Sequence, residues 1–324
     1  MGDLPHAMLP DRLGICIFPE RSVRDLVDVA IFADELGIGF LGVGDVQELW
    51  ADPYVGLSAA AIATKRIKLG PWVTNPVTRH PGVTANAMMT LNDVSGGRAV
   101  LGIGVGDGSV RLMGAKPAKL DDLASAIAGI RTSMENACER LPGPPIPIYW
   151  AAAGERSTRA GARVADGVIV SGWIAGEMLQ DAVRVMAEGA GGRTVRPLQV
   201  FNTALAIDDD PEVAIRRARP YVARALARPS SAKVPGWSDA EVERFRRAYD
   251  FRRHFRADQE LAGLVPNELV QKKAVAGTPL DCARLLHAVI ASGFDRVVLI
   301  LVGEPKVLLE RLVREVIPLI PRVP

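Results

Sequence analysis

The chain has 324 residues, of which 48% are hydrophobic and 5% aromatic, and its formal net charge at pH 7 is +2. So small a charge gives no sign of nucleic acid or a membrane surface as a partner. The aliphatic composition is typical of parallel strands buried on both faces, and the length suits one α/β barrel with insertions. We therefore expect a single domain over residues 1–324.

Signals for export, membrane insertion and metal binding are missing from the sequence. No apolar stretch reaches the roughly 18 residues that a membrane helix needs, and the first residues lack a signal-peptide pattern. The three cysteines, Cys16, Cys138 and Cys282, lie far apart, and the four histidines have no metal-ligand spacing. We expect a cytoplasmic protein with reduced thiols, no metal, and a small molecule as its substrate.

Eight short aliphatic runs alternate with helical patterns along the chain. The expected strands span residues 13–18, 40–45, 67–74, 98–105, 147–152, 167–172, 197–207 and 295–302. Apolar residues follow the helical period most clearly in 22–37 and 305–317. Strict alternation predicts parallel strands with right-handed crossovers, and eight units favour a closed (β/α)8 TIM barrel over an open sheet.

The longest interval between expected strands lies between the seventh and the eighth. Two helical patterns, near 210–228 and 238–260, are joined there by the turn-rich segment 229–237, so we expect a helical insertion at about 208–275. From Glu212 to Glu260 there are 12 Lys and Arg against 7 Asp and Glu. This excess fits either a solvated helical surface or a basic wall beside an anionic ligand.

Ligand-binding groups of such barrels lie where the strands end, at the C-terminal face. The second strand ends in Asp45, a carboxylate that barrel packing does not need, and Trp50 follows as an apolar wall for a ligand. The structural alternative for Asp45 is a helix cap, and that for Trp50 is ordinary packing in the protein interior. The third strand ends in the run Gly70–Pro76, whose two prolines and one asparagine indicate a bulge at the barrel mouth.

The fourth strand ends in alternate glycines from Gly102 to Gly108, which would let a flat ligand lie against backbone. Their order does not match the GxGxxG fingerprint of dinucleotide-binding folds. Within this run Gly106 is a candidate ligand contact. Asp107 is a candidate proton donor or polar anchor, with a loop cap as its structural alternative.

The fifth and sixth strand ends complete the expected mouth. Ala153, Gly154, Glu155 and Arg156 open a helix, where free backbone N–H groups and the arginine could bind phosphate. The sixth strand ends in the small-residue turn Ser171–Gly172. The sequence has no GxSxG, Walker or HExxH signature and no lysine at these first six strand ends, which argues against hydrolase, nucleotide-hydrolysing and Schiff-base functions.

Two stretches together resemble the luciferase-like oxidoreductases. They are Gly70–Pro81, which contains T-N-P-V-T-R-H-P, and Leu91–Asp107, which reads L-N-D-V-S-G-G-R-A-V-L-G-I-G-V-G-D. The motifs P-I-Y-W-A-A-A-G, A-D-G-V-I-V and A-G-T-P extend the resemblance over most of the chain. The pattern looks most like the branch that uses the deazaflavin coenzyme F420, which includes methylene-tetrahydromethanopterin reductases and glucose-6-phosphate dehydrogenases.

The resemblance implies roles for the residues at the strand ends. It implies a cis peptide bond between Trp72 and Val73, behind the deazaflavin ring, and a catalytic position at Asp107. Positions that match cofactor contacts, or that form the Gly-lined wall and the phosphate corner, are Asp45, Asn75, Gly106, Ala153, Gly154, Glu155, Arg156, Ser171 and Gly172.

The chain departs from the sugar-phosphate members of that branch. Val46 stands where those proteins have His, and Trp173–Ala175 occupies the place of a Lys, so we do not expect a sugar phosphate as substrate. The hairpin that relatives carry between positions corresponding to 118 and 147 is missing here, which would leave the mouth more open.

These observations predict a coenzyme F420-dependent oxidoreductase. Hydride would pass between the deazaflavin C5 and a small organic substrate with a C=O, C=N or C=C bond, stacked near Trp50. Asp107 is the first candidate for the acid and His80 the second. The alternatives are an FMN-dependent luciferase-like monooxygenase and a cofactor-binding protein without turnover. The Ala-rich segment 57–63, and the dimers common in the family, predict a homodimer.

Overall fold

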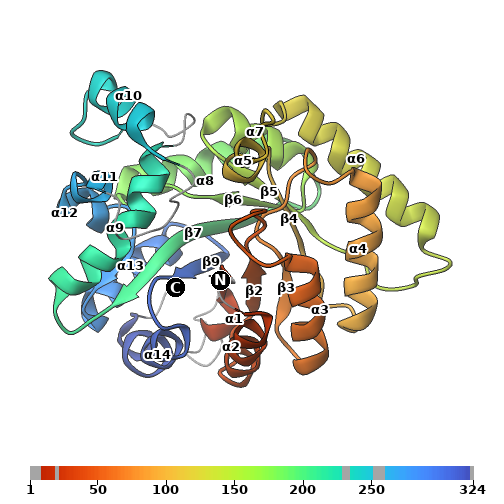
Figure 1. Cartoon of the computed structure of the whole chain (residues 1–324), viewed down its shortest axis with the longest axis horizontal. Helices are drawn as coiled ribbons and strands as arrows, with labels where there is room; N and C mark the ends of the chain where they lie inside the picture. Colours follow the sequence, from red (N-terminus) through yellow and green to blue (C-terminus); the bar gives the residue numbers. More distant parts are fainter. Residues whose placement is uncertain (1–8, 19–21, 228–233, 251–259, 322–324) are drawn as a thin grey trace.

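The structure, a computed structural model, describes residues 9–18, 22–227, 234–250 and 260–321 (Figure 1). In this part of the chain nine strands form one parallel sheet. They are β1 (Leu13–Ile17), β2 (Phe40–Val43), β3 (Lys68–Pro71), β4 (Leu101–Ile103), β5 (Ile148–Ala152), β6 (Gly167–Val170), β7 (Leu198–Ile207), β8 (Val275–Gly277) and β9 (Arg296–Leu301).

The strand order is β3-β2-β1-β9-β7-β6-β5-β4, which is the order of an eight-stranded barrel. The end strands β3 and β4 meet through two isolated parallel bridges, Leu69 with Ala99 and Thr74 with Ile103, so the barrel is nearly closed. All eight strands expected from the sequence are present, and the expected eighth strand is β9. The predicted (β/α)8 architecture is therefore confirmed.

Strand β8 was not expected from the sequence. It pairs with the last residues of β7, Leu205–Ile207, after the earlier residues of β7 have paired with β9. Strand β7 therefore extends beyond the barrel and carries a ninth strand beside it. Three residues are too few to give a recognisable period-two pattern.

Helices surround the barrel on its outer face, as Figure 1 shows. They are α2 (Val23–Glu35), α3 (Pro53–Ala63), α4 (Pro81–Val94), α6 (Leu120–Ala137), α7 (Glu155–Val164), α8 (Gly176–Ala190), α13 (Pro279–Ala291) and α14 (Pro305–Arg311). Two short helices, α1 (Leu9–Arg12) and α5 (Gly108–Leu112), precede β1 and follow β4. A π-helical turn, Leu312–Val316, and a 3-10 turn, Ile317–Leu319, follow α14. No helix in the described segments is long and apolar enough to cross a membrane.

Side-chain caps fix where several of these helices begin. Ser22 accepts a hydrogen bond from the backbone N–H of Arg24 at the start of α2, and Asp52 accepts two at the start of α3. Thr278 and Asp281 form a capping box at α13. Between residues 118 and 147, all of which are described, the chain forms α6 and no strand, so the hairpin expected to be missing is indeed not there.

Aromatic rings fill the inside of the barrel. The ring centroids of Phe40 and Trp72 lie 4.7 Å apart, and those of Trp72 and Tyr149 lie 6.3 Å apart. Gly42 makes room for them, because a Cβ atom at this position would lie 2.6 Å from the Cβ of Trp72. Mostly aliphatic side chains between the strands and the outer helices form a separate hydrophobic cluster.

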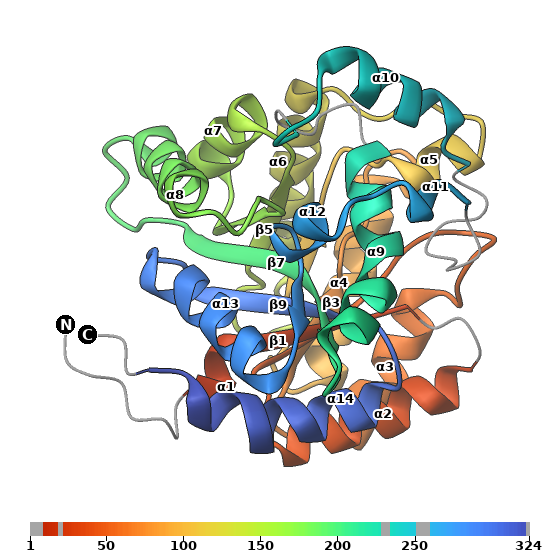
Figure 2. The ribbon, with the colours of Figure 1, turned by 90° about the vertical axis from the view of Figure 1, so that its left-hand side faces the viewer.

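The insertion between β7 and β9 covers one side of the barrel (Figure 2). It contains α9 (Pro211–Ala227), α10 (Asp239–Ala248), α11 (Glu260–Gly263) and α12 (Asn267–Gln271), followed by β8. The predicted helix near 210–228 is confirmed as α9. The pattern at 238–260 corresponds to α10 and the start of α11, while 229–233 and 251–259 lie outside the described residues.

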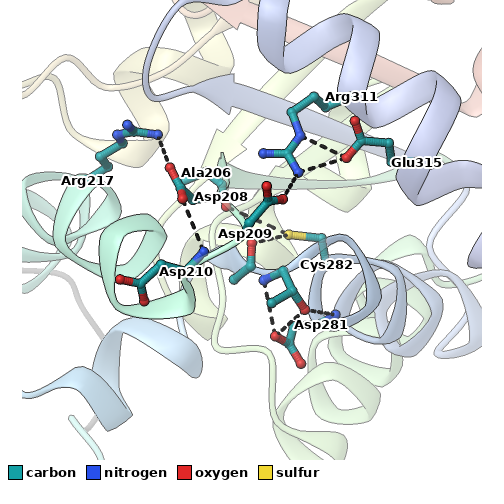
Figure 3. A network of polar contacts seen from close by, with 11 residues as sticks. Ala206, Asp208, Asp209, Asp210, Arg217, Asp281, Cys282, Arg311 and Glu315 are labelled. Carbon is teal, nitrogen blue, oxygen red and sulfur yellow. Dashed lines mark hydrogen bonds and ion pairs between the residues drawn. The ribbon is translucent and has the colours of Figure 1, made fainter.

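Ion pairs lie on both sides of the turn at the start of the insertion (Figure 3). Asp208 pairs with Arg217 of α9 at 2.9 Å. The neighbouring Asp209 pairs with Arg311 of α14, which also pairs with Glu315 at 2.8 Å. The turn between β7 and α9 is therefore fixed from both sides.

Candidate active site

A cavity of about 300 Å³ lies at the carboxyl ends of the barrel strands. Eight of the residues expected at the site line it, namely Asp45, Trp50, Trp72, Val73, Gly106, Asp107, Ala153 and Ser171. The other six predicted residues are Asn75, His80, Gly154, Glu155, Arg156 and Gly172, and they lie outside its lining.

Trp72 and Val73 form one wall of the cavity. The peptide bond between them is cis, as the resemblance implied. The indole Nε1 of Trp72 donates a hydrogen bond of 2.9 Å to Oδ1 of Asn202 in β7, across the barrel. Thr74 then rejoins the sheet, because its backbone N–H donates to Gly102 at 3.0 Å. The irregular backbone expected after the third strand is thus present.

Asp45 follows β2 and is 4% exposed. Its Oδ2 accepts a hydrogen bond of 2.7 Å from Thr74 Oγ1, and its Oδ1 accepts one of 2.7 Å from Gln47 Nε2. Burial raises the pKa of the Asp45 carboxyl above its ordinary value, and the bond from Thr74 and the charge of Arg79 oppose that rise. Asp45 is therefore a buried acid at the edge of the cavity.

Two stacked rings form another part of the cavity lining. The centroids of Phe18 and Trp50 lie 4.3 Å apart, with an angle of 24° between the ring planes. Gly44 allows this packing, because a Cβ atom there would lie 2.5 Å from Phe18 and 2.8 Å from Trp50. The pair gives the cavity a flat aromatic surface.

The run after β4 brings backbone to the cavity surface. Gly106 has φ +77°, and a Cβ atom at this position would lie 2.3 Å from Val110. Asp107 follows, and its Oδ1 accepts a hydrogen bond of 2.9 Å from Nε of Arg111, one turn along α5. Both residues of this ion pair line the cavity.

The turn before α7 has the features expected of an anion-binding corner. Gly154 has φ +94° at the N-cap position, and no side chain caps the helix there. Arg156 is exposed in the first turn, whereas Glu155 points to Arg159 of the same helix at 2.8 Å. Ala153, next to this turn, lines the cavity.

A buried lysine supports the turn that follows β6. Nζ of Lys273 donates to the backbone oxygens of Ser171 and Gly172, at 2.7 and 2.8 Å, and lies 4.9 Å from the ring centroid of Trp173. The hydroxyl of Ser171 donates to the backbone oxygen of Asn202 at 2.9 Å. Lys273 therefore holds the turn from behind, and Gly172, which it contacts, does not line the cavity.

Asn75 and His80 have structural contacts in place of cavity contacts. Oδ1 of the buried Asn75 accepts hydrogen bonds from the backbone N–H groups of Val77 and Thr78, at 3.0 and 2.8 Å. His80 is exposed, and its Nδ1 caps α4 by accepting a bond of 3.1 Å from Gly82. This geometry does not support the expectation of His80 as a catalytic acid, because its ring is turned to its own helix.

Cys16, Phe18, Asn202 and Arg224 are among the lining residues that sequence reasoning did not identify as part of the site. Cys16 is 1% exposed, and burial raises the pKa of its thiol to about 12, against the opposing charge of Arg224. Arg224 lies on α9, and the sequence indicated a basic group at the site only through the local excess of basic residues. Asn202 lies within a strand, where strand-end reasoning does not look.

The described residues offer no cluster of metal-binding side chains. Among the residues with described positions, no group of three or more His, Cys, Asp or Glu side chains is arranged to hold a metal ion. All three cysteines are free, and only Cys138 is exposed.

Comparison with known proteins identifies curated relatives of the whole barrel. The chain is 27% identical over 337 residues to a 5,10-methylenetetrahydromethanopterin reductase of Methanopyrus kandleri, covering 90% of this chain and 92% of the relative. It is 31% identical over 260 residues to an F420-dependent glucose-6-phosphate dehydrogenase of Nakamurella multipartita, covering 69% and 76%.

Solved structures share the fold at lower identity. The coenzyme F420-dependent tetrahydromethanopterin reductase from Methanopyrus kandleri has a TM-score of 0.77 at 23% identity, with 96% of this chain and 99% of that chain covered. An F420-dependent secondary alcohol dehydrogenase in complex with an F420-acetone adduct has a TM-score of 0.76 at 17% identity, with 96% and 99% covered. The model of the luciferase-like monooxygenase family matches residues 8–296, and the chain belongs to that family.

Proposed function

We propose that this protein is an oxidoreductase that uses coenzyme F420 to transfer hydride to or from a small organic substrate. The observation that carries the proposal is the cavity at the barrel mouth, walled by Trp72–Val73 and by the glycine run after β4. The F420-dependent relatives named above support the choice of cofactor.

The chemistry of the lining residues fits a deazaflavin ring. A tricyclic ring needs flat apolar surface, which Val73, Ile169 and Ile300 provide, and its pyrimidine edge needs donors and acceptors, which Ser171 and Asn202 provide. A volume of about 300 Å³ is at the small end of the range for cofactor and ligand pockets. The tail of the cofactor would then extend outside the cavity, and Arg156 with the uncapped start of α7 would hold its phosphate.

When bound, the deazaflavin would supply or accept the hydride, and the protein would do the rest. Phe18 and Trp50 would hold the substrate flat against the ring and exclude water from it. For reduction of a C=O or C=N bond, the acceptor carbon gains the hydride and its heteroatom gains a proton. Asp107 is the residue that we propose for delivering that proton, because it lines the cavity beside the glycine run. Its ion pair with Arg111 favours the ionised carboxylate, so Asp107 would have to leave Arg111 and take up a proton before it could act as the acid.

An FMN-dependent monooxygenase is the second candidate function. It is favoured by the description of the family model and by the shared fold of a 3,6-diketocamphane monooxygenase from Pseudomonas putida in complex with FMN, with a TM-score of 0.65 at 20% identity. The same cavity would serve either ring, so the two candidates differ in the cofactor and in oxygen use.

Equilibrium titration with coenzyme F420 and with FMN tests the choice between them. Quenching of protein fluorescence can report binding, because Trp50 and Trp72 line the cavity. We expect F420 to bind with a Kd in the micromolar range or below, on the order of −8 kcal/mol, and FMN to bind far more weakly. Preference for FMN, together with substrate-dependent oxygen uptake, would replace our proposal with the monooxygenase.

We further propose that two copies of the chain associate through α3. Val55 and Ile62 are 64% and 77% exposed, and they lie two turns apart on the same side of the helix. Val83, at the start of the adjacent α4, is 51% exposed. Exposed aliphatic side chains gathered in this way are typical of a surface that another subunit covers.

A further inference from the structure

We propose that the substrate site continues into a second cavity, between α2, α14 and α9, and that this second cavity binds a protonated amine of the substrate. The inference rests on the proposed function, because it assigns the chemical class of the molecule that would lie against the cofactor. The carboxylates of the second cavity would determine specificity and would take no part in hydride transfer.

The second cavity has a volume of about 680 Å³, against about 300 Å³ for the cavity at the barrel mouth. Its walls come from the carboxyl ends of β1 and β9, the first half of α2, the start of α14, and α9. Helices α2 and α14 pack side by side here (Figure 2). We call this space the α2–α14 cavity.

The two cavities adjoin at shared aromatic and aliphatic side chains. Phe18 and Ile300 line both of them, and Phe18 stacks on Trp50 in the first, with ring centroids 4.3 Å apart. Tyr221 lines the α2–α14 cavity, and its hydroxyl lies 3.3 Å from that of Ser171, which lines the first cavity. A molecule that passes Phe18 would therefore reach from one cavity to the other.

The first cavity has little room for a cofactor ring and a whole substrate together. Its volume of about 300 Å³ is at the lower limit of pockets that take one small molecule. A deazaflavin ring seated there would fill most of it, so the part of the substrate away from the reducible bond would extend past Phe18. The α2–α14 cavity supplies the space for that part.

Acidic groups outnumber basic groups on the walls of the α2–α14 cavity. Asp25 and Asp28 lie one turn apart on α2, so they project from the same face, and Glu304 directly precedes α14. Lys306 is the one lysine or arginine among the described lining residues. In the described part of the chain, no ion pair or side-chain hydrogen bond engages the three carboxylates, so a cationic ligand would find them available.

An organic cation suits these walls better than a metal ion does. No three acidic, His or Cys side chains of the described segments are arranged to hold a metal, so the carboxylates of this cavity do not form a common coordination site. Leu26, Val29 and Val302 provide apolar surface in the same cavity. An ammonium group donates three hydrogen bonds to separated acceptors, while its carbon chain packs on apolar surface. We therefore expect a primary amine, which stays protonated at pH 7.

Matched amines and alcohols test the proposal without the natural substrate. The probes are hexylamine with hexanol and 3-phenylpropylamine with 3-phenylpropanol, and 3-phenylpropanoate supplies the opposite charge. Isothermal titration calorimetry of the full chain, with and without F420, measures their affinities. The fluorescence of bound deazaflavin shows whether a probe also reaches the cofactor ring.

The test variant combines Asp28→Asn with Glu304→Gln, which removes two carboxylates and keeps the shape of the cavity. Asp28 is exposed, and the side chain of Glu304 caps no N–H group of α14, so the fold should be preserved. The matched control combines Glu35→Gln with Asp93→Asn, which removes two exposed carboxylates that do not line the cavity.

In the wild type and in the control we expect at least one amine to bind about tenfold more tightly than its alcohol. The carboxylate probe should bind no more tightly than 3-phenylpropanol. With F420 bound, the preferred amine should also change the deazaflavin fluorescence. In the test variant the amine and the alcohol should bind equally, while the affinity for F420 stays within about threefold of the wild type.

Equal binding of amine and alcohol by the wild type would overturn the proposal, as would an amine preference that survives in the test variant. Amine binding that leaves the deazaflavin fluorescence unchanged would also overturn it, since the α2–α14 cavity would then be separate from the substrate site. If F420 does not bind, the proposed function fails, and the shared substrate site fails with it. The amine preference of the cofactor-free protein is measured in either case, so the two failures are distinguishable.

Discussion

The side-chain nitrogen of Lys273 lies 2.7 Å from the backbone oxygen of Ser171, although 102 residues separate them in the chain. Lys273 is 7% exposed and lies two residues before the start of β8, at the end of the insertion. The insertion therefore reaches the cavity at two places: this ammonium group holds the turn after β6, and Arg224 of α9 lines the cavity.

Replacing Lys273 with Met should loosen the turn after β6. The variant removes two charge-assisted hydrogen bonds and leaves two backbone oxygens without them, which we expect to cost about 2–3 kcal/mol of unfolding free energy. Chemical denaturation measures this loss. Cofactor titration of the folded variant should show weaker binding, and Lys273→Arg should restore part of it.

The adjacent Lys272 provides the control. It pairs with Glu268 on the protein surface, and its side chain is 40% exposed, so Lys272→Met should change the stability by less than about 1 kcal/mol. If Lys273→Met destabilises the protein but leaves cofactor affinity intact, the turn does not position the cofactor.

Replacing Asp107 with Asn should reduce turnover far more than cofactor affinity. Asn keeps the shape of the side chain but cannot deliver a proton, and loss of a general acid typically costs about 100-fold or more in rate. Steady-state kinetics and F420 titration separate the two effects. Arg111→Gln removes the ion-pair partner only, and turnover equal to the wild type in Asp107→Asn would exclude Asp107 from proton transfer.

Replacing Trp50 with Leu should raise the KM for the substrate. The variant removes the stack with Phe18, whose centroid lies 4.3 Å away, and an aromatic stack contributes about 1 kcal/mol beyond buried area. We expect the KM to rise about five- to tenfold, with little change in F420 affinity. The opposite pattern, weaker F420 binding at constant KM, would move Trp50 to the cofactor side of the cavity.

Replacing Asp45 with Asn should alter how stability depends on pH. The folded protein holds the Asp45 proton more tightly than the unfolded chain, because burial raises the pKa. This group therefore favours folding at low pH, and its contribution is lost as the pH rises through the raised pKa.

Asn does not titrate, so between about pH 4 and about pH 7 Asp45→Asn should gain stability relative to the wild type. Denaturation at both pH values measures the difference. Asp93→Asn, which removes an exposed carboxylate from α4, controls for the change in net charge. Parallel stability curves for the wild type and Asp45→Asn would contradict the raised pKa.

Replacing Ile62 with Lys should separate the two copies of the proposed dimer. The side chain is 77% exposed in the single chain, so the change should leave the fold intact while placing a charge in the proposed interface. Analytical ultracentrifugation measures the mass in solution. Val195→Lys is the control, because Val195 is 74% exposed in the loop before β7. A wild-type monomer would refute the dimer directly.

The barrel could be predicted from sequence because its signals are repeated. Eight aliphatic runs in alternation with helical patterns leave few alternative topologies, even where the strands are shorter than expected, as in β4. Strand β8 was not predicted because it forms by pairing with β7. That pairing is a tertiary contact, and three residues are too few to give a sequence pattern that predicts it.

The candidate site was only partly predictable for a related reason. Residues at strand ends, such as Asp45 and Asp107, follow from the rule that barrel sites lie at the C-terminal face. Arg224 and Lys273 belong to the insertion, whose position over the mouth depends on packing between distant segments. His80 caps α4 in the structure, a role that its position before a proline at a helix start allows equally well, so its part in catalysis stays a prediction.

The bridges between β3 and β4 close the barrel beside one wall of the cavity. Leu69 with Ala99 and Thr74 with Ile103 form this junction, and Trp72 and Val73 lie between the two bridges in sequence. Strands β3 and β4 are thus joined by isolated bridges and not by a continuous ladder, beside the cavity wall that Trp72 and Val73 form. A ligand seated there would touch both sides of the junction and brace it, so backbone amides from 99 to 104 would exchange with solvent more slowly in the complex than in the free protein.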